Sequence, residues 1–187
     1  DSTWRILSLP HDWSIEGDFS LDNPSTPGGG ALPGGIGWYR KTFTLPETDR
    51  DKVIYVDFDG VYRNSEVWIN GHSLGFRPNG YVSFRYDLTP YLRYGSQPNV
   101  IAVKADNSEQ PNSRWYSGSG IYRNVWLVKV NPVHVDNWGT FVHDMKISSE
   151  EATFALEVRI RNSSEADREA EVSTSIYDDR NKVVTAS

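Results

Sequence analysis

Short runs of β-branched and aromatic residues recur along the chain and constrain its fold more than any other feature. No segment sustains the 3.6-residue period of an amphipathic helix. Asn70-Gly71 predicts a hairpin turn, because both residues tolerate positive φ, and Asp87–Leu92 predicts one short helical turn. The pattern predicts an all-β fold, an antiparallel sandwich. The expected strands of its first part are Lys41–Leu45, Val53–Asp59, Val67–Asn70, Tyr81–Asp87, Val100–Ala105 and Ile121–Val130.

One long loop interrupts this pattern. Residues 21–37 contain six Gly and three Pro, a composition that breaks strands and helices alike. Loops of this length inside a compact domain are usually functional or disordered. Its glycines lack the Lys-Ser/Thr pair of a phosphate-binding loop, so we expect a flexible rim.

Composition changes near Asn131-Pro132, where we place a domain boundary. Residues 1–131 hold 20 of the 24 aromatic side chains. Residues 132–187 predict four further strands, about half the number in an immunoglobulin-like sandwich. The alternative is a small complete tail of four strands. The strands expected there are Val133–Val142, Thr153–Arg161, Glu169–Ile176 and Val183–Thr185.

Charge and cysteine content exclude several functions. The net charge of −6 argues against a nucleic-acid binder, and the absence of cysteine excludes disulfides and thiolate metal sites. The four histidines show no metal-ligand spacing. No apolar run approaches the ~18 residues of a membrane span. The chain begins at Asp1 without Met, which slightly favours a trimmed signal peptide and a periplasmic or secreted location.

A loop rich in Arg, Trp and Tyr carries the candidate binding residues. This loop follows Asn112, and residues 113–127 hold two glycines, three serines, four aromatics and two arginines. Flat aromatic rings beside charged hydrogen-bond donors suit a sugar ring. Arg114 is the favoured ligand-binding residue, because its guanidinium is a fixed multi-donor fork; the alternative is an Arg–carboxylate tie to its own domain. Trp115 and Tyr116 are expected to pack under the loop rather than stack on a sugar.

Other polar groups offer weaker candidates. Glycoside hydrolysis needs two carboxyl groups about 5–9 Å apart, and Asp57 and Asp59 lie on one strand face; an ordinary polar face is the simpler interpretation. His11 and Asp12 are interpreted as a hydrogen-bonded pair, since no nucleophile elbow accompanies them. Three tryptophans in strand patterns are expected in the core or at an inter-domain contact; they are Trp38, Trp68 and Trp126.

Five segments in order resemble the N-terminal sugar-binding domain of family 2 glycoside hydrolases, closest to the β-galactosidase branch. The most specific is Arg-Trp-Tyr-Ser-Gly-Ser-Gly-Ile-Tyr-Arg, and together the five cover about residues 9–130. They are Leu9–Trp13, Gly37–Lys41, Phe58–Val61 leading to Val67–Gly71, Asp87–Leu92 and Arg114–Arg123.

The resemblance implies a jelly-roll, galactose-binding-like sandwich over 1–131, followed by the first part of an immunoglobulin-like domain over 132–187. It implies the non-catalytic portion of a retaining exo-glycosidase that acts on a β-galactoside-type carbohydrate. In that family both catalytic glutamates lie in a (β/α)₈ barrel of the same chain, and no segment here matches it. No catalytic residue is therefore expected in this chain, although the parent would be an enzyme.

The resemblance also implies what the loop at Arg114 does. In the family this loop places one or two side chains at the rim of the sugar subsite, which makes Asn112, Ser113, Arg114 and Trp115 the candidate substrate-binding residues. Family members carry an acidic residue near here that binds sodium; this chain has Asn112 and Ser113 instead, so no metal or cofactor is expected in it, and a sodium or magnesium ion is left to the parent. The glycine-rich loop would reach toward the active-site mouth.

Two other functions remain open, and a homo-oligomer is compatible with all three. A stand-alone carbohydrate-binding module should display several exposed aromatics on one strand face. A structural or protein-interaction sandwich should bind no sugar. Sugar specificity and linkage lie beyond the sequence, because the barrel decides them in the resembled family.

Overall fold

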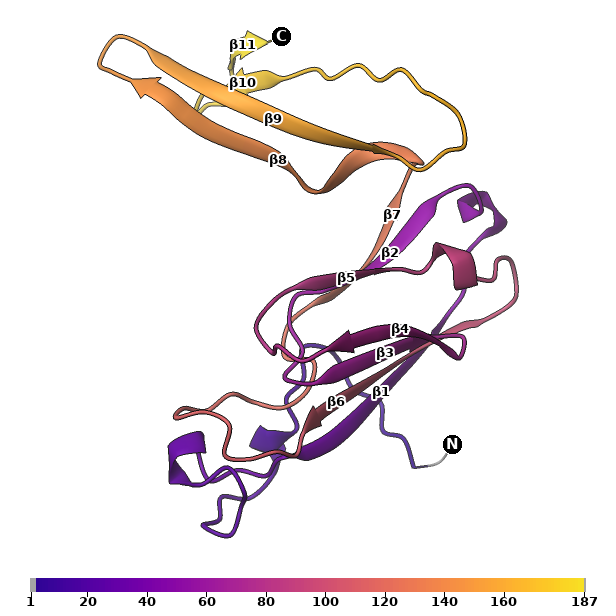
Figure 1. Cartoon of the computed structure of the whole chain (residues 1–187), viewed down its shortest axis with the longest axis vertical. Helices are drawn as coiled ribbons and strands as arrows, with labels where there is room; N and C mark the ends of the chain where they lie inside the picture. The colour runs from indigo at the N-terminus through magenta and orange to yellow at the C-terminus, as the bar shows by residue number, and fades with distance from the viewer. Residues whose placement is uncertain (1–2, 187) are drawn as a thin grey trace. The chain divides into compact units, whose positions relative to one another are not determined.

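The computed structural model describes residues 3–186, and its contacts divide the chain into two compact units, Asp1–Val130 and Asn131–Ser187. Eleven strands and four 3₁₀ turns of three residues each make up the regular structure of the described residues (Figure 1). The all-β prediction is confirmed. None of the helices in this part of the chain has the length and apolar character that crossing a membrane requires.

Two antiparallel sheets form the first unit, a β-sandwich (Figure 1). One sheet has the order β1-β6-β3-β4, with β1 Gly35–Phe43, β6 Asn99–Asn107, β3 Ser65–Ile69 and β4 His72–Arg77. The other has the order β5-β2-β7, with β5 Phe84–Asp87, β2 Val53–Phe58 and β7 Val125–Val130. The four turns are η1 Ser14–Glu16, η2 Pro27–Gly29, η3 Glu47–Asp49 and η4 Thr89–Tyr91; η4 confirms the predicted helical turn.

The hydrophobic core lies between these two sheets. Alternate residues of β3 are buried while those between them are partly exposed, as expected of a strand with one face on a core. The ring of Phe58 stacks on that of Phe84 with centroids 5.0 Å apart. The buried cluster comprises Val56, Phe58, Val61, Val67, Ile69, Tyr86, Leu88, Val103, Ala105 and Ile121.

The predicted hairpin turn joins β3 to β4. Asn70 and Gly71 both have positive φ, 50° and 86°, the geometry that a two-residue turn of this type requires. Strand β4 itself was not predicted. It is an edge strand interrupted by Gly75, and its register with β3 shifts beside Val67, so its sequence lacks a regular alternation.

Two other strands begin at residues that the sequence did not indicate. Strand β1 starts at Gly35, inside the predicted loop. A side chain at Gly37 would lie 2.3 Å from the Trp13 ring, so glycine at this position marks a close approach inside a strand and not a loop. Strand β7 starts at Val125 instead of Ile121. Ile121 is buried in the core, and its N–H donates to the Tyr39 hydroxyl, so it does not continue the ladder.

The second unit consists of two hairpins. The long one pairs β8 Val133–Ile147 with β9 Ala152–Asn162, and the short one pairs β10 Ser175–Tyr177 with β11 Val183–Ala186. No hydrophobic side chain of residues 131–185 is buried. Phe141, Val142 and Phe154 each expose about half of their surface or more. This unit therefore presents uncovered apolar faces.

We predict that the chain self-associates through residues 133–187, because uncovered apolar strands and unpaired edges invite pairing with another copy. A chain ending at Pro132 should be more monomeric and should keep the sandwich. Light scattering of both chains at matched concentrations tests this. A strictly monomeric full chain, with residues 133–187 protected from hydrogen exchange, would instead indicate a complete small domain.

Candidate functional site

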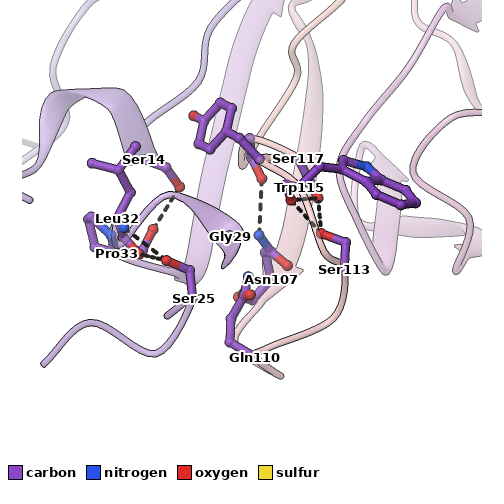
Figure 2. Close-up of a pocket in the computed structure, with 12 residues that line it drawn as sticks. Ser14, Ser25, Gly29, Leu32, Pro33, Asn107, Gln110, Ser113, Trp115 and Ser117 are labelled. Atoms are coloured by element: carbon purple, nitrogen blue, oxygen red, sulfur yellow. Dashed lines mark hydrogen bonds between the residues drawn. The ribbon is translucent and has the colours of Figure 1, made fainter. Parts of the chain in front are cut away.

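The candidate site is the loop of residues 108–124, which connects β6 to β7. Its base is a buried polar network around Asn107, the last residue of β6, which is 3% exposed. The Asn107 amide nitrogen donates to the Gly118 carbonyl (3.0 Å) and to Ser119 Oγ (2.8 Å), and its oxygen accepts from Asn112 Nδ2 at 2.6 Å. Both amide hydrogens and the amide oxygen of Asn107 thus hold the two ends of the loop. Figure 2 shows one of these bonds leaving the Asn107 nitrogen toward the loop.

The N-terminal segment closes the base from the other side. Asp12 Oδ1 accepts from the N–H of Ser119 (2.8 Å) and from that of Ser14 (3.0 Å), while Oδ2 accepts from the Tyr116 hydroxyl. Ser14 Oγ lies 2.7 Å from Ser119 Oγ. Burial, together with the bond to Asp12, raises the pKa of Tyr116. A neutral Tyr116 is therefore retained as a donor to the Asp12 carboxylate.

Two glycines make this close approach sterically allowed. Gly118 has φ +75°, and a Cβ there would lie 2.7 Å from Asp12 Oδ2. Gly120 has φ +120°, and a Cβ there would lie 2.2 Å from the Tyr39 hydroxyl. Both positions require positive φ and an absent side chain. The glycines of the Ser-Gly-Ser-Gly run thus have a packing role and form no nucleophile elbow.

Tyr39 and Tyr62 complete the anchoring. The Tyr39 hydroxyl lies 2.9 Å from His11 Nδ1 and accepts from the Ile121 N–H at 3.3 Å. Tyr62 exchanges two backbone hydrogen bonds with Gly120, and its hydroxyl donates to Asn112 Oδ1 at 3.1 Å. Segments around Asp12, Tyr39, Tyr62 and the loop therefore converge at one end of the sandwich.

The tip of the loop is displayed to solvent. Arg114 is exposed, and within residues 3–186 its side chain forms no hydrogen bond or ion pair, so the alternative tie to a carboxylate is wrong. Trp115 is 61% exposed, so the expectation that it packs under the loop is wrong. Tyr116 is 41% exposed, but its hydroxyl reaches Asp12 at the base of the loop. Figure 2 shows the Trp115 ring pointing away from Asn107.

Asn112 and Ser113 are already bonded within the loop. Asn112 Nδ2 also donates to the Glu109 carbonyl at 2.9 Å. Ser113 Oγ donates to the Trp115 carbonyl (2.6 Å) and lies 2.8 Å from Ser117 Oγ. Contact of any of these residues with a sugar stays a prediction, but the guanidinium of Arg114 and the exposed ring faces of Trp115 could make one without breaking the bonds of the loop.

The space behind the loop is too small for a sugar. The cavity between Asn107, Ser25 and Tyr116 has a volume of about 10 Å³ (Figure 2), room for about one water molecule. The glycine-rich loop beyond it is held closed by Ser25, whose Oγ donates to the Leu32 carbonyl at 2.7 Å and accepts from the Leu32 N–H at 2.8 Å. A sugar therefore does not fit behind the 108–124 loop.

The residues present do not fit a cation site. Asn112 Oδ1 accepts from Tyr62, and Ser113 Oγ is engaged within the loop. Among residues 3–186 there is no group of three or more His, Asp or Glu side chains that could hold a metal ion. No step of the proposed function is assigned to a metal on this chain.

The two other candidate groups have structural partners. Asp57 forms a two-point ion pair with Arg85, at 2.6 Å for each bond, and Asp59 accepts from Trp126 Nε1 at 3.1 Å. The interpretation of His11 and Asp12 as a bonded pair is wrong: His11 Nε2 lies 3.1 Å from Glu16 Oε1 and its Nδ1 bonds Tyr39.

The strand tryptophans do not lie in the core of the first unit. Trp38 is 50% exposed and Trp126 is 55% exposed. The rings of Trp38 and Trp68 stack with centroids 5.4 Å apart, on the face of their sheet opposite the core. Their inter-domain role stays a prediction.

Sequence reasoning missed Asn107, Tyr62 and Tyr81. Tyr81 accepts a hydrogen bond from Trp115 Nε1 at 3.1 Å, and its ring packs edge-on against Tyr62 with centroids 5.4 Å apart. Asn107 lies two residues beyond the predicted strand Val100–Ala105, where a polar residue is ordinary, so only its burial distinguishes it.

Replacing Asn107 with alanine should destabilise the first unit by roughly 1–3 kcal/mol, because partners of a buried amide are left unsatisfied. Urea unfolding followed by tryptophan fluorescence measures this. Ser108→Ala, at an exposed neighbour bonded to Asp106, should change the free energy of unfolding by only a few tenths of a kcal/mol. Equal effects of the two substitutions would contradict a special role for Asn107.

Stability should also fall at high pH through Tyr39. Burial, above all, raises the pKa of this half-buried phenol from 10.0 to about 12. A phenol whose folded pKa is raised contributes stability that is present below pH 10 and is lost as the pH rises toward 12. Tyr39→Phe should therefore flatten the decline of the unfolding free energy over that window, measured by urea titrations at several pH values. An unchanged slope would contradict the assignment.

Comparison with known proteins gives the family. The model for "Glycosyl hydrolases family 2, sugar binding domain" matches residues 19–131. A beta-galactosidase of Bacteroides ovatus, BoGH2A, is 58% identical over 178 residues, which are 95% of this chain and 21% of that protein. A putative beta-glucuronidase of Formosa agariphila is 47% identical over 86% of this chain and 15% of its own length.

Solved structures agree. A beta-glycosidase from Bacteroides vulgatus superposes with a TM-score of 0.90 and 46% identity, covering all of this chain and 24% of its own. The chain spans about a fifth of the length of the first of these relatives. With the resemblance in its five segments and the β-sandwich, these matches show that the chain belongs to the family 2 glycosyl hydrolases, with their sugar-binding domain over residues 19–131.

Proposed function

We propose that this chain is the non-catalytic, sugar-binding and scaffolding portion of a longer retaining glycoside hydrolase that acts on β-galactosides. The 108–124 loop would form part of the rim of the substrate site, and a (β/α)₈ barrel in the same longer chain would supply the catalytic carboxyl groups. The first relative is called a beta-galactosidase, which supports this choice among the sugars of the family.

One observation carries the proposal: Arg114 and Trp115 stand exposed on a loop whose two ends are fixed by buried hydrogen bonds. A guanidinium offers several donors in a fixed geometry to sugar hydroxyls. An indole offers an apolar face to the C–H side of a pyranose. A rigid base lowers the entropy lost when these side chains bind.

The runner-up is a stand-alone carbohydrate-binding module. The exposed Trp38 beside the partly buried Trp68 on one sheet face favours it, since such a module displays aromatics on a strand face. However, these two rings stack on each other at an interplanar angle of 27°, so each covers one face of the other. They offer a sugar less flat surface than two rings lying side by side.

Arg114→Ala in the longer hydrolase should lower kcat/KM roughly 10–1000-fold, the loss expected for one charged hydrogen bond to substrate. Thermal unfolding should be unchanged, because Arg114 has no partner within the described residues. Steady-state kinetics with a nitrophenyl β-galactoside measure the effect, and Arg93→Ala, at the opposite end of the sandwich, is the control. Wild-type kinetics in Arg114→Ala would reduce this residue to a structural role.

The 187-residue chain alone should not hydrolyse nitrophenyl β-galactoside. The two carboxylates that the sequence offered as candidates are Asp57, paired with Arg85, and Asp59, bonded to Trp126. Neither is free to act as acid or nucleophile. Release of nitrophenol by highly purified chain, abolished by Asp57→Asn or Asp59→Asn, would contradict the proposal.

A further inference from the structure

The exposed indole of Trp115 is held by a side chain from another part of the chain. Its Nε1–H donates to the hydroxyl of Tyr81 at 3.1 Å. Tyr81 lies in the connection between β4 and β5 and is itself 49% exposed. The Tyr81 hydroxyl comes from a segment outside the 108–124 loop, so its bond to Nε1 ties the nitrogen edge of the indole to the sandwich. This bond fixes the plane of the ring while its faces stay open.

Tyr81 is positioned in turn by buried groups. Its ring meets that of Tyr62 edge-on at 5.4 Å and 62°, and Tyr62 is 4% exposed. Its backbone N–H donates to Asn79 Oδ1 at 2.8 Å. Gly80 permits this packing, because a Cβ there would lie 2.2 Å from the Tyr62 ring. The exposed hydroxyl of Tyr81 is therefore presented on a rigid base.

These contacts link Asn112, Tyr62, Tyr81 and Trp115 in a ring, because Asn112 and Trp115 belong to the same loop. The Tyr62 hydroxyl donates to Asn112, which lies three residues before Trp115 in the loop. Two tyrosines outside the loop thus connect its anchored beginning to its exposed tip. The result is an aromatic ring that is open to solvent yet held in one orientation, directly after the unpaired guanidinium of Arg114.

We propose that Tyr81 is a positioning residue, which holds the Trp115 indole as the stacking surface for the C–H face of a β-galactopyranoside. The inference rests on the proposed sugar-binding function of the loop. Stacking on a sugar requires a face of the ring to be open and its orientation to be set. Tyr81 supplies the second condition without touching the substrate, and Arg114 can donate to a hydroxyl beside the stacked ring.

The test is a titration of the 187-residue chain with methyl β-D-galactopyranoside, followed by NMR of the indole N–H signals. The wild type should bind weakly, at millimolar concentrations or above, with the largest shift at Trp115. Tyr81→Phe keeps the ring but removes the hydroxyl, and it should raise Kd by about threefold to tenfold, the effect of one lost hydrogen bond. Trp115→Phe should raise it at least as much.

Matched controls separate positioning from general changes. Trp126→Phe removes another indole that is 55% exposed and donates at 3.1 Å, to Asp59, and should leave Kd unchanged. Tyr91→Phe removes the hydroxyl of a tyrosine at the other end of the sandwich and should also have no effect. The melting temperature of each variant shows whether it folds.

The outcomes distinguish this inference from the proposed function. Saturable binding with the same Kd in the wild type and in Tyr81→Phe overturns the role of Tyr81 and leaves the sugar-binding loop in place. Binding that neither Arg114→Ala nor Trp115→Phe weakens, or no saturable binding at all, contradicts the proposed function. A higher Kd in Tyr81→Phe and Trp115→Phe, with both controls unchanged, supports the inference.

Discussion

The hydrogen bonds of one buried amide, that of Asn107, are the constraint on which the rest of the site depends. Leaving a buried donor or acceptor unpaired costs far more free energy than a satisfied bond contributes. The fold must therefore bring a partner to the polar atoms of this amide. Its two donors take Gly118 and Ser119, and its acceptor takes Asn112. The loop between these residues can therefore close in few ways, and its tip is placed accordingly.

A similar arrangement holds the opposite end of the sandwich. The Asn70 side chain donates to the Tyr91 carbonyl (2.8 Å) and to Asn99 Oδ1 (2.9 Å), and it accepts from the Val100 N–H at 2.9 Å. Asn99 is fully buried. Buried asparagines thus tie the turns at both ends, while the hydrophobic cluster fills the space between the sheets. The segments that identify the family divide between these two ends.

The parts of the fold that depend on residues adjacent in sequence were predicted correctly. The hairpin at Asn70-Gly71 and the turn at Thr89–Tyr91 follow from residues adjacent in sequence. The start of β1 could not be predicted, because Gly37 reflects the distant ring of Trp13. Ile121 alternates like a strand residue but is withdrawn from the ladder by the Tyr39 hydroxyl.

The candidate site shows the same division. The composition of the loop predicted a binding surface with Arg114 as its favoured residue, and the family resemblance added Trp115. Rules for burial of aromatics misplaced Trp115, because its partner Tyr81 lies 34 residues away and is itself exposed. Asn112 was proposed as a substrate-binding residue for its polar side chain, but that side chain is hydrogen-bonded to Tyr62 and Asn107. Which polar group is free and which is committed depends on tertiary contacts that no local pattern contains.

The separation of a fixed base from a displayed tip has a consequence for how such a chain can diverge. Substitutions at Arg114 or Trp115 alter what the loop offers to a ligand while the buried bonds below remain intact, so new specificities can be sampled at little risk to folding. Changes in loop length are different. Ser113 and Ser117 are joined across the tip at 2.8 Å, and Gly118 and Gly120 admit no side chain. Diversity among descendants of this sequence should therefore concentrate in the identity of two or three neighbouring residues, with insertions and deletions directed elsewhere.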